Sequence, residues 1–384
     1  MIKSSVNHDV RINNGRIITD ILFRREPLTK QELIELTNMS LPTVTAILKH
    51  LQESGLITHG EKQKSTGGRP PQLVMPIYDA AYSIGIFVTS NHVRICLTDL
   101  ASKIVARAKY DLAMEDTSAY WQGVYEFFLT FKNDFKINDK KLLGIGIAMS
   151  TMPDREASIL TILSGDKRIT LNAQYIFDAF ADCGVEVKIR NEAKMAALAH
   201  ARRDDTSPAD FIYLSMNNNL AGAIVANRDV IRYSSRNAEF GHMIVEYGGR
   251  RCVCGMRGCF DTYLSATALQ GEAGLSREDF FARLAEGNND CDGIWNRYLD
   301  RFVIFLSNIR VCFDTNILIG GIMSPYLAEY RADWEKRLYE LQRPHVDESE
   351  FTTDYIYTSD LGEYGSAMGA GLLFNDRFLA NVFS

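Results

Sequence analysis

The sequence predicts an α/β protein in which a small domain of helices and one β-hairpin precedes a larger body. Apolar residues recur at helical spacing near the start of the chain, whereas the following stretch of about 300 residues alternates between strand-like and helix-like segments. The chain has 384 residues, of which 46% are apolar and 23% charged, as in an ordinary globular protein. We therefore expect a first domain at 1–78 and a body at 79–384.

The bulk features of the chain indicate a cytoplasmic protein without a membrane partner. No run of about 18 uncharged apolar residues occurs, and residues 1–15 lack the apolar core of a secretion signal. Seven cysteines, three of them clustered, suit metal binding in a reducing compartment better than disulfides. The remaining cysteines are expected in the core: Cys96, Cys183, Cys291 and Cys312.

Three helices are predicted in the first domain. Residues 12–24 place isoleucines at helical spacing. Thr29 and Glu32 have the spacing of a capping box, which starts a second helix, and Ser40 caps a third helix that Gly55 closes. The small core is expected from apolar side chains on the second and third helices: Leu33, Ile34, Leu36, Val44, Ile47, Leu48 and Leu51.

A β-hairpin is predicted after the third helix, with strands at 56–59 and 72–77 and a basic tip at 62–66. Helix, helix, short turn, helix and hairpin is the order of a winged helix-turn-helix, which binds double-stranded DNA. Residues 1–75 carry ten Lys/Arg against seven Asp/Glu, a net charge of +3 on a chain of net charge −6. A basic end on an acidic body favours contact with a polyanion. A helical protein-interaction module with a solvated loop is the alternative.

The candidate DNA contacts lie on the third helix and beyond the hairpin tip. Pro42, Thr43 and Thr45 occupy early positions of the helix, where short side chains reach base edges in a major groove. Lys49, one turn later, is placed to meet a phosphate. An arginine in the extended segment 67–71 suits a narrow minor groove. The candidate set is Ser40, Pro42, Thr43, Thr45, Lys49 and Arg69.

The body is predicted to begin with three strands over 80–111, joined by tight turns at Ser90–Asn91 and Ala101–Ser102. A helix at 117–136 and a buried strand at 142–150 follow. The later elements are a helix at 175–184, a strand and helix over 185–203, two strands over 210–231, a helix around 295–313, a strand at 316–321 and helices at 325–341 and 365–379. Interleaved strands and helices of this length indicate an α/β body of two lobes.

The segment 237–265 carries the most specific chemical pattern. Cys252, Cys254 and Cys259 fall within eight positions, and His242 lies ten residues before the first of them. Glycines between them let the backbone turn tightly enough to converge the four side chains. Three thiolates and one imidazole describe a closed, tetrahedral structural Zn²⁺ site, which holds a loop together without Lewis-acid chemistry. Three free cysteines in a glycine-rich turn are the alternative.

Two acids, Glu239 and Asp261, flank the four expected ligands in the sequence. Folding of the segment around a metal would bring both carboxylates close to His242. The loop is therefore predicted to present polar groups to a small ligand.

These motifs resemble the ROK family, named for repressors, open reading frames and kinases. Gly241-His242, the three cysteines, and the spacing from Asp261 to Ser265 are similar to the family signature. Residues 84–100 stand where the family has its first phosphate loop, and 187–201 stand where it has its catalytic-acid motif. The resemblance covers nearly the whole chain. It implies an actin-like, hexokinase-type fold with two ribonuclease-H-like lobes and a sugar cleft, and the winged helix resembles the repressor branch.

Three departures from the kinase pattern predict that nucleotide chemistry is lost. Kinase members place Asp-x-Gly-Gly-Thr in the first loop, whereas residues 87–91 lack both the acid and the glycines. The second loop, 216–222, keeps one glycine, although phosphate approach needs bare backbone. Asn-Asp-Ala-Asn becomes 191–194, Asn-Glu-Ala-Lys, and the longer arm of Glu192 displaces the acid. We therefore expect no enzyme activity, with a sugar kinase carrying a regulatory head as the alternative.

The sugar side of the family pattern is better kept. The residues that the resemblance places against sugar hydroxyls are Asn191, Glu192, Glu239, His242 and Asp261. Carboxylates and an imidazole suit a polyol, and the family uses one nitrogen of this histidine for zinc and the other for sugar. Shorter Asp261 and longer Glu192 leave room for a polyol other than the usual hexose. The alternative is that Glu192 and Glu239 are surface acids.

Together these features predict a sugar-responsive transcriptional regulator, expected to be a repressor. Its winged helix would bind operator DNA, and its body would bind a sugar or sugar derivative as effector. Paired recognition helices need paired half-sites, so a homodimer or a tetramer is expected. A further alternative is a regulator whose body binds a protein and whose sugar cleft is vestigial.

Overall fold

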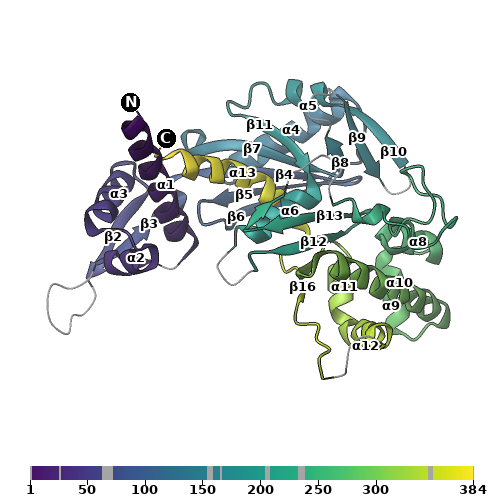
Figure 1. Cartoon of the computed structure of the whole chain (residues 1–384). Helices are drawn as coiled ribbons and strands as arrows, with labels where there is room; N and C mark the ends of the chain where they lie inside the picture. Colours follow the sequence, from purple (N-terminus) through teal and green to yellow (C-terminus); the bar gives the residue numbers. More distant parts are fainter. Residues whose placement is uncertain are drawn as a thin grey trace.

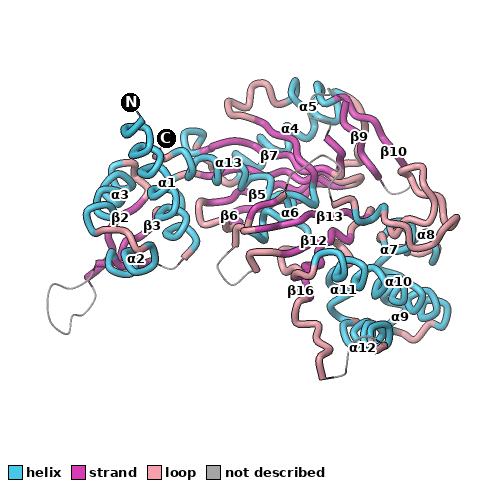
Figure 2. Tube along the Cα trace, viewed as in Figure 1, coloured by secondary structure: helices cyan, strands magenta, loops and turns pink. Residues whose placement is uncertain are grey.

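The computed structural model describes residues 2–25, 27–62, 72–153, 159–164, 167–203, 208–231, 238–344 and 349–383. A small domain, called the head below, lies at one end of a body that contains two five-stranded sheets (Figure 1). Strands run through the middle of the body, and helices gather in its lower right part (Figure 2). The expected order of a head followed by an α/β body is confirmed. The longest described helices carry charges along their length, and none in these ranges could span a bilayer.

The head contains three helices and a three-stranded sheet of order β1-β3-β2. Its elements are α1 (Ile2–Arg24), β1 (Leu28–Thr29), α2 (Lys30–Thr37), α3 (Leu41–Glu53), β2 (Ile57–Lys62) and β3 (Gln72–Pro76). Thr29 and Glu32 form the predicted capping box, since each side chain bonds the other residue's backbone N–H. The Ser40 side chain accepts from Thr43 N at 3.4 Å and starts α3, also as predicted. Strand β1, which pairs with the wing, was not predicted.

The core of the head confirms most of the apolar positions that the sequence indicated. Leu33, Val44, Ile47, Leu48 and Leu51 are buried. Ile34 is half-buried, and the prediction for Leu36 is wrong because its side chain is 45% exposed. The head core also contains Phe383, which comes from the far end of the chain.

The first sheet of the body has the order β11-β7-β4-β5-β6. Its strands are β4 (Tyr82–Val88), β5 (His92–Asp99), β6 (Ile104–Asp111), β7 (Leu142–Met149) and β11 (Val187–Asn191). The first three are antiparallel, and β7 and β11 add in parallel. Helices α4 (Ser118–Asp134) and α5 (Ala173–Ala179) pack their aromatic side chains against it. The second of these ends at Ala179 rather than at Gly184, where the sequence suggested.

The second sheet repeats this design with the order β14-β13-β12-β15-β16. Its strands are β12 (Phe211–Met216), β13 (Leu220–Ala226), β14 (Asp229–Val230), β15 (Asn316–Gly320) and β16 (Ile356–Thr358). Six helices belong to this lobe: α7 (Asp261–Leu264), α8 (Ala266–Ala273), α9 (Arg277–Ala285), α10 (Asn289–Phe313), α11 (Ser324–Glu329) and α12 (Arg331–Gln342). The single helix predicted at 325–341 is therefore two helices, which meet at Tyr330.

A small sheet of order β10-β9-β8 extends the first lobe and was not predicted. Its strands are β8 (Thr151–Pro153), β9 (Ile159–Ser164) and β10 (Lys167–Asn172). Four short 3₁₀ turns complete the described elements: η1 (Tyr78–Ala80), η2 (Asp139–Lys141), η3 (Phe240–His242) and η4 (Gly362–Tyr364). Of the four cysteines expected in the core, Cys96 and Cys291 are buried, Cys183 is half-buried and Cys312 is exposed.

Helices α6 (Glu192–Ala201) and α13 (Gly365–Asn381) lie between the two sheets and share one core with both. Close approach depends on small residues. A Cβ at Gly85 would lie 1.7 Å from the Ala367 carbonyl oxygen, and one at Gly369 would lie 1.7 Å from that of Met195. The far end of α13 leaves the body and reaches the head, where Figure 1 places both ends of the chain. Helix α13 therefore contacts both sheets of the body and the head.

Candidate functional site

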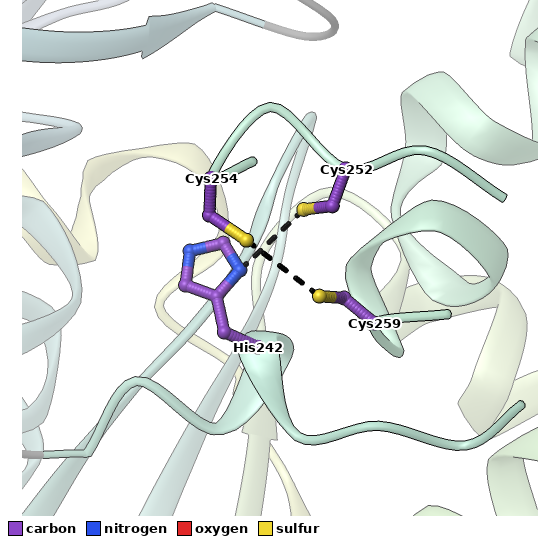
Figure 3. A group of neighbouring side chains, drawn as sticks. All are labelled: His242, Cys252, Cys254 and Cys259. Carbon is purple, nitrogen blue, oxygen red and sulfur yellow. Dashed lines mark hydrogen bonds between the residues drawn. The ribbon is translucent and has the colours of Figure 1, made fainter. Parts of the chain in front are cut away.

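Four side chains from the loop before α7 converge on one point (Figure 3). Donor atoms of His242, Cys252, Cys254 and Cys259 all lie within 4.8 Å of one another. The Cys254 and Cys259 sulfurs are 3.7 Å apart. His242 Nδ1 lies 3.6 Å from the Cys252 sulfur. The four residues that the sequence predicted as ligands are therefore brought together and could hold a metal ion.

Two of the distances between these atoms are those expected around a tetrahedral metal such as Zn²⁺. With Zn–S bonds of about 2.3 Å and Zn–N bonds of about 2.0–2.1 Å, neighbouring ligands lie about 3.8 Å (S to S) and 3.6 Å (S to N) apart. Burial raises the pKa of the Cys252 thiol and raises that of Cys259 to about 11. Both thiols would therefore stay protonated unless a cation stabilised the thiolates.

The loop backbone holds these residues in place before any metal is considered. Ile244 and Cys259 form an isolated antiparallel bridge, and Arg251 forms another with Arg257. Gly258 has φ +81°, and a Cβ there would lie 1.6 Å from the Glu246 carbonyl oxygen. Only glycine fits at this position, so Gly258 is one sequence feature that lets the four side chains converge.

His242 connects the cysteine cluster to the expected sugar side. Its Nδ1 faces Cys252, and Figure 3 shows the second ring nitrogen on the other side of the ring. Burial lowers the pKa of His242, which keeps the ring neutral and able to ligate a metal. The second nitrogen is then available to a ligand outside the cluster.

Asp261 and Glu239 form a pair of acids beside the cluster. Asp261 is 5% exposed, and its carboxylate accepts the Leu220 N–H at 2.5 Å. Burial raises the pKa of Asp261 to about 6, although bonds from Leu220 and Asn219 oppose the rise. Burial raises the pKa of Glu239 to about 7, opposed by Lys194 and reinforced by Asp261. Carboxyl groups near neutrality can both donate to and accept from hydroxyl groups.

Glu192 lies in a buried hydrogen-bond network and not on the surface, so the surface-acid alternative is wrong for this residue. It is 1% exposed. Ser215 Oγ donates to its Oε1 at 3.0 Å, and Ser366 Oγ donates to its Oε2 at 3.1 Å. Burial raises its pKa, and these bonds oppose the rise. Asn191, just before it, caps α6 by accepting the Lys194 N–H at 3.2 Å.

Asn217 joins Glu192 to the rest of the second lobe. Its amide donates to Glu192 Oε2 at 3.3 Å and to Ser215 Oγ at 3.0 Å. Its carbonyl oxygen accepts the Ile322 N–H at 2.9 Å. The β12–β13 turn that starts at Asn217 also supplies Leu220 N–H to Asp261. This turn therefore connects two of the five candidate sugar residues.

Sequence reasoning missed Ser215, Asn217 and Ser366 as members of the site. Three consecutive asparagines at 217–219, in a turn that is glycine-rich in kinases, were the available signal. Ser366 sits 174 residues from Glu192 in the sequence, and no local pattern links the two.

The candidate DNA face lies on the outer side of α3. Ser40, Pro42, Thr45 and Lys49 are exposed, and Thr43 is half-buried. The hydroxyls of Ser40 and Thr43 are 2.8 Å apart, whereas Lys49 pairs with Glu53 at 3.6 Å in an exposed contact of small energy. Arg69 lies outside the described residues.

The inner side of α3 makes a contact that was not predicted. His50 Nε2 lies 2.8 Å from the main-chain oxygen of Val382, and its ring packs on Phe383 with centroids 4.7 Å apart. The helix expected to read DNA is therefore in direct contact with residues that follow α13.

Comparisons with known proteins agree with this architecture. The ROK family model matches residues 83–377, and a winged helix-turn-helix DNA-binding model matches 15–58. The chain is 26% identical over 390 residues to the xylose repressor of Bacillus subtilis (strain 168), covering 96% of each protein.

Two solved structures show the fold. A ROK family transcriptional regulator, described as a homologue of the Escherichia coli MLC protein, superposes with a TM-score of 0.75 at 18% identity, covering 98% of each chain. A ROK family glucokinase from Streptomyces griseus, in complex with glucose and AMPPNP, has a TM-score of 0.61 at 18% identity and covers 76% of this chain and 99% of its own. With a ROK model matched over most of its length and a winged helix-turn-helix matched ahead of it, the protein belongs to the ROK family and carries an N-terminal DNA-binding domain.

Proposed function

We propose that this protein is a sugar-responsive DNA-binding regulator that represses transcription and performs no phosphoryl transfer. The observation that carries the proposal is Asn217, whose side chain occupies the β12–β13 turn and bonds Glu192 and Ile322. A nucleotide phosphate needs free backbone amides and an acid free to act. The relative with matching length is named a xylose repressor, which supports a regulator with a sugar effector.

The first phosphate-loop position supports the same proposal. Thr89 N–H donates to the His92 carbonyl at 2.9 Å, and Thr89 Oγ1 accepts the His92 N–H at 3.2 Å. The Thr89 amide of the β4–β5 turn is therefore already bonded within the protein. The rival is a sugar kinase with a regulatory head, which the glucokinase superposition favours. That rival requires sugar-dependent ATP turnover that Glu192→Gln abolishes, whereas our proposal requires none with pentoses, hexoses or amino sugars.

The proposed sugar contacts are the five residues around the loop: Asn191, Glu192, Glu239, His242 and Asp261. Glu239 is the best placed to meet a ligand, because it is half-buried while Glu192 and Asp261 already accept protein hydrogen bonds. We assign the four converging side chains of the loop 237–265 to one structural Zn²⁺ ion. When bound, the ion supplies the charge that keeps three thiolates ionised and fixes His242.

In this proposal the head and the body bind different partners. The head, residues 1–78, would bind operator DNA through Ser40, Pro42, Thr43, Thr45, Lys49 and Arg69, and the body, 79–384, would bind the effector. A homodimer or tetramer would place two recognition helices on two half-sites. Ligand preference for one body conformation, by about 1–3 kcal/mol, would change operator affinity.

The test is operator affinity at fixed salt with and without a panel of sugars that starts from xylose. The expected result is a sugar that weakens binding by about 5- to 150-fold. Glu239→Gln should remove this response and leave binding without sugar unchanged. Glu246→Gln, an exposed acid on the same loop, is the matched control and should respond normally. A sugar response that survives Glu239→Gln would contradict the assignment of Glu239 as a sugar contact, and the lack of a response to any sugar would instead favour a body that binds a protein partner.

A further inference from the structure

A second cavity lies between the head and the body, away from the proposed sugar contacts. Its volume is about 440 Å³. Helix α1 forms one wall and the second half of α13 forms another. The turns β5–β6 and β13–β14 and the residue after α6 complete the lining. None of the five proposed sugar residues lines this cavity.

The lining of this cavity is rich in guanidinium groups. Four arginines line it, two from the head and two from the body: Arg16, Arg24, Arg202 and Arg228. Three aspartates also line it, so the formal charge of the lining is +1. Asp376 and Asp229 both pair with Arg202, at 2.7 Å and 2.5 Å. Two of the three carboxylates are therefore directed to one arginine.

The head arginines are less fully compensated. Arg16 Nε donates to the main-chain oxygen of Ala380 at 2.9 Å, a neutral acceptor. Arg24 pairs through Nε with Asp20 at 2.6 Å, and its side chain is 17% exposed. Burial lowers the pKa of Arg24, and Arg202 and Arg228 lower it further, whereas Asp20 and Asp376 oppose these shifts. An anion between the two walls would relieve this repulsion.

We propose that this cavity binds a small phosphate-bearing carbohydrate through Arg24 and the body arginines. A planar guanidinium presents paired donors that match the oxygens of a phosphate. Water occupies about 30 Å³ per molecule in the liquid, so inorganic phosphate alone would leave most of the cavity to water. Its size is that of sites for small metabolites, and Phe23, Leu100 and Leu379 supply apolar wall for a carbon skeleton.

Binding at this position would cross-link the head to the body. Arg24 belongs to α1 of the head, whereas Arg202 follows α6 in the body and Arg228 joins β13 to β14. A phosphate held by both walls stabilises one orientation of the head and so changes operator affinity. This last consequence rests on the proposed regulatory function, but ligand binding itself does not.

The experiment is calorimetric titration of the full-length protein with a hexose 6-phosphate, the free hexose and inorganic phosphate at constant ionic strength. We expect the sugar phosphate to bind at one site per chain, with at least about tenfold weaker binding of inorganic phosphate. Arg24→Gln should weaken sugar-phosphate binding by about tenfold or more, the scale of one charge-assisted contact. Arg11→Gln, an exposed arginine of the same helix outside the cavity, should leave it unchanged.

A second variant tests the same cavity in case Arg24→Gln fails to fold. Ser102→Asp adds a negative charge to the lining at a position with φ +58°, which aspartate tolerates. It should abolish sugar-phosphate binding while leaving the response to the neutral effector intact. The proposal is overturned if hexose phosphates do not bind at millimolar concentration, if both cavity variants bind them normally, or if a neutral sugar competes with them.

Discussion

The two five-stranded sheets of the body share one strand order, but their first hairpin turns are held in different ways. In the first sheet, bonds between Thr89 and His92 close the β4–β5 turn. The main-chain oxygens of Ser90 and Asn91 in this turn also accept N–H groups of the segment 112–114, which follows β6. In the second sheet, the β12–β13 turn is bonded through Asn217 to α6 and to the residues after β15. The same topology thus yields, in one lobe, a turn bonded to the segment that follows a neighbouring strand. In the other lobe it yields a turn whose side chain reaches α6, between the two sheets.

The difference extends to the way in which each sheet is joined to α13. Ser83 of β4 donates directly to Asn375 Oδ1 at 2.6 Å, and Asn375 donates to the Asp99 oxygen at 2.7 Å. The second sheet reaches α13 through Glu192, which Ser215 and Ser366 bond from either side. The second sheet is therefore joined to α13, the helix that meets the head, through the candidate ligand residue Glu192, whereas the bonds of Ser83 and Asn375 involve none of the candidate ligand residues.

The largest expected effect is that removal of the metal destabilises the second lobe and leaves the first lobe intact. Cys254→Ser, or a strong chelator, should destabilise the body by at least about 4 kcal/mol, because a structural metal contributes its binding energy to folding. Hydrogen exchange should show lost protection in α7, α8 and η3, while β4–β7 stay protected. Cys312→Ser, which changes an exposed cysteine outside the cluster, is the control and should keep one metal per chain by elemental analysis. Equal loss of protection in both sheets would contradict the comparison.

The next effect compares the two turns directly. Asn217→Ala removes the acceptor of Ile322 N–H and a donor to buried Glu192, at a cost of about 2–4 kcal/mol. Thr89→Ala in the equivalent turn removes only the side-chain hydrogen bonds to the main chain of His92, and it should cost about 1 kcal/mol or less. Urea unfolding at pH 7 measures both. Similar costs for the two substitutions would remove the distinction between the turns.

An acid titration examines the other end of α6. Burial lowers the pKa of His200 to about 4, Arg203 lowers it further and Asp360 opposes this. Its Nε2 lies 2.8 Å from Ser359 Oγ beside the second sheet. The unfolded chain takes up the proton first, so stability is complete above about pH 6.5 and falls as the pH drops toward 4. At pH 5 the loss should be about 2 kcal/mol.

The control for this titration is His200→Gln, which keeps a polar partner for Ser359 but cannot titrate. The difference in unfolding free energy between the two proteins should depend on pH over this window and be constant above pH 7. A difference that does not vary with pH would mean that His200 is not buried as a neutral ring.

The smallest effect concerns the two serines that join the sheets to α13. Ser366→Ala and Ser83→Ala should each cost about 1 kcal/mol, the usual worth of one hydrogen bond. Only Ser366→Ala should alter the sugar response, because only Ser366 touches a candidate ligand residue. Operator titrations with sugar measure the response. An equal change of the sugar response in both variants would mean that Glu192 does not link the sugar site to α13.

Local patterns were sufficient to predict much of this molecule. The capping box of Thr29 and Glu32 and the Ser40 cap are set by residues three apart in the chain. The four residues of the metal cluster all lie within 18 positions of the chain. Each of these features is fixed by short-range geometry. Their positions could therefore be predicted from the sequence.

Features that depend on distant contacts could not be predicted. Strand β1 has two residues and exists because β3 pairs with it. The network of Glu192 is completed by Ser366 on another helix, and the exposure of Cys312 depends on which face of α10 packs. Apolar periodicity also continues through Tyr330, where the chain changes from α11 to α12.

The contact of Phe383 with the head core sets an order of events during synthesis. His50 and Val382, which bond each other, are 332 residues apart in the chain. The head emerges first from the ribosome, and the part of its apolar core that Phe383 covers stays open until translation has reached the residues beyond α13. A chain that ends before Phe383 would thus leave part of the apolar surface of the head, next to α3, open to water.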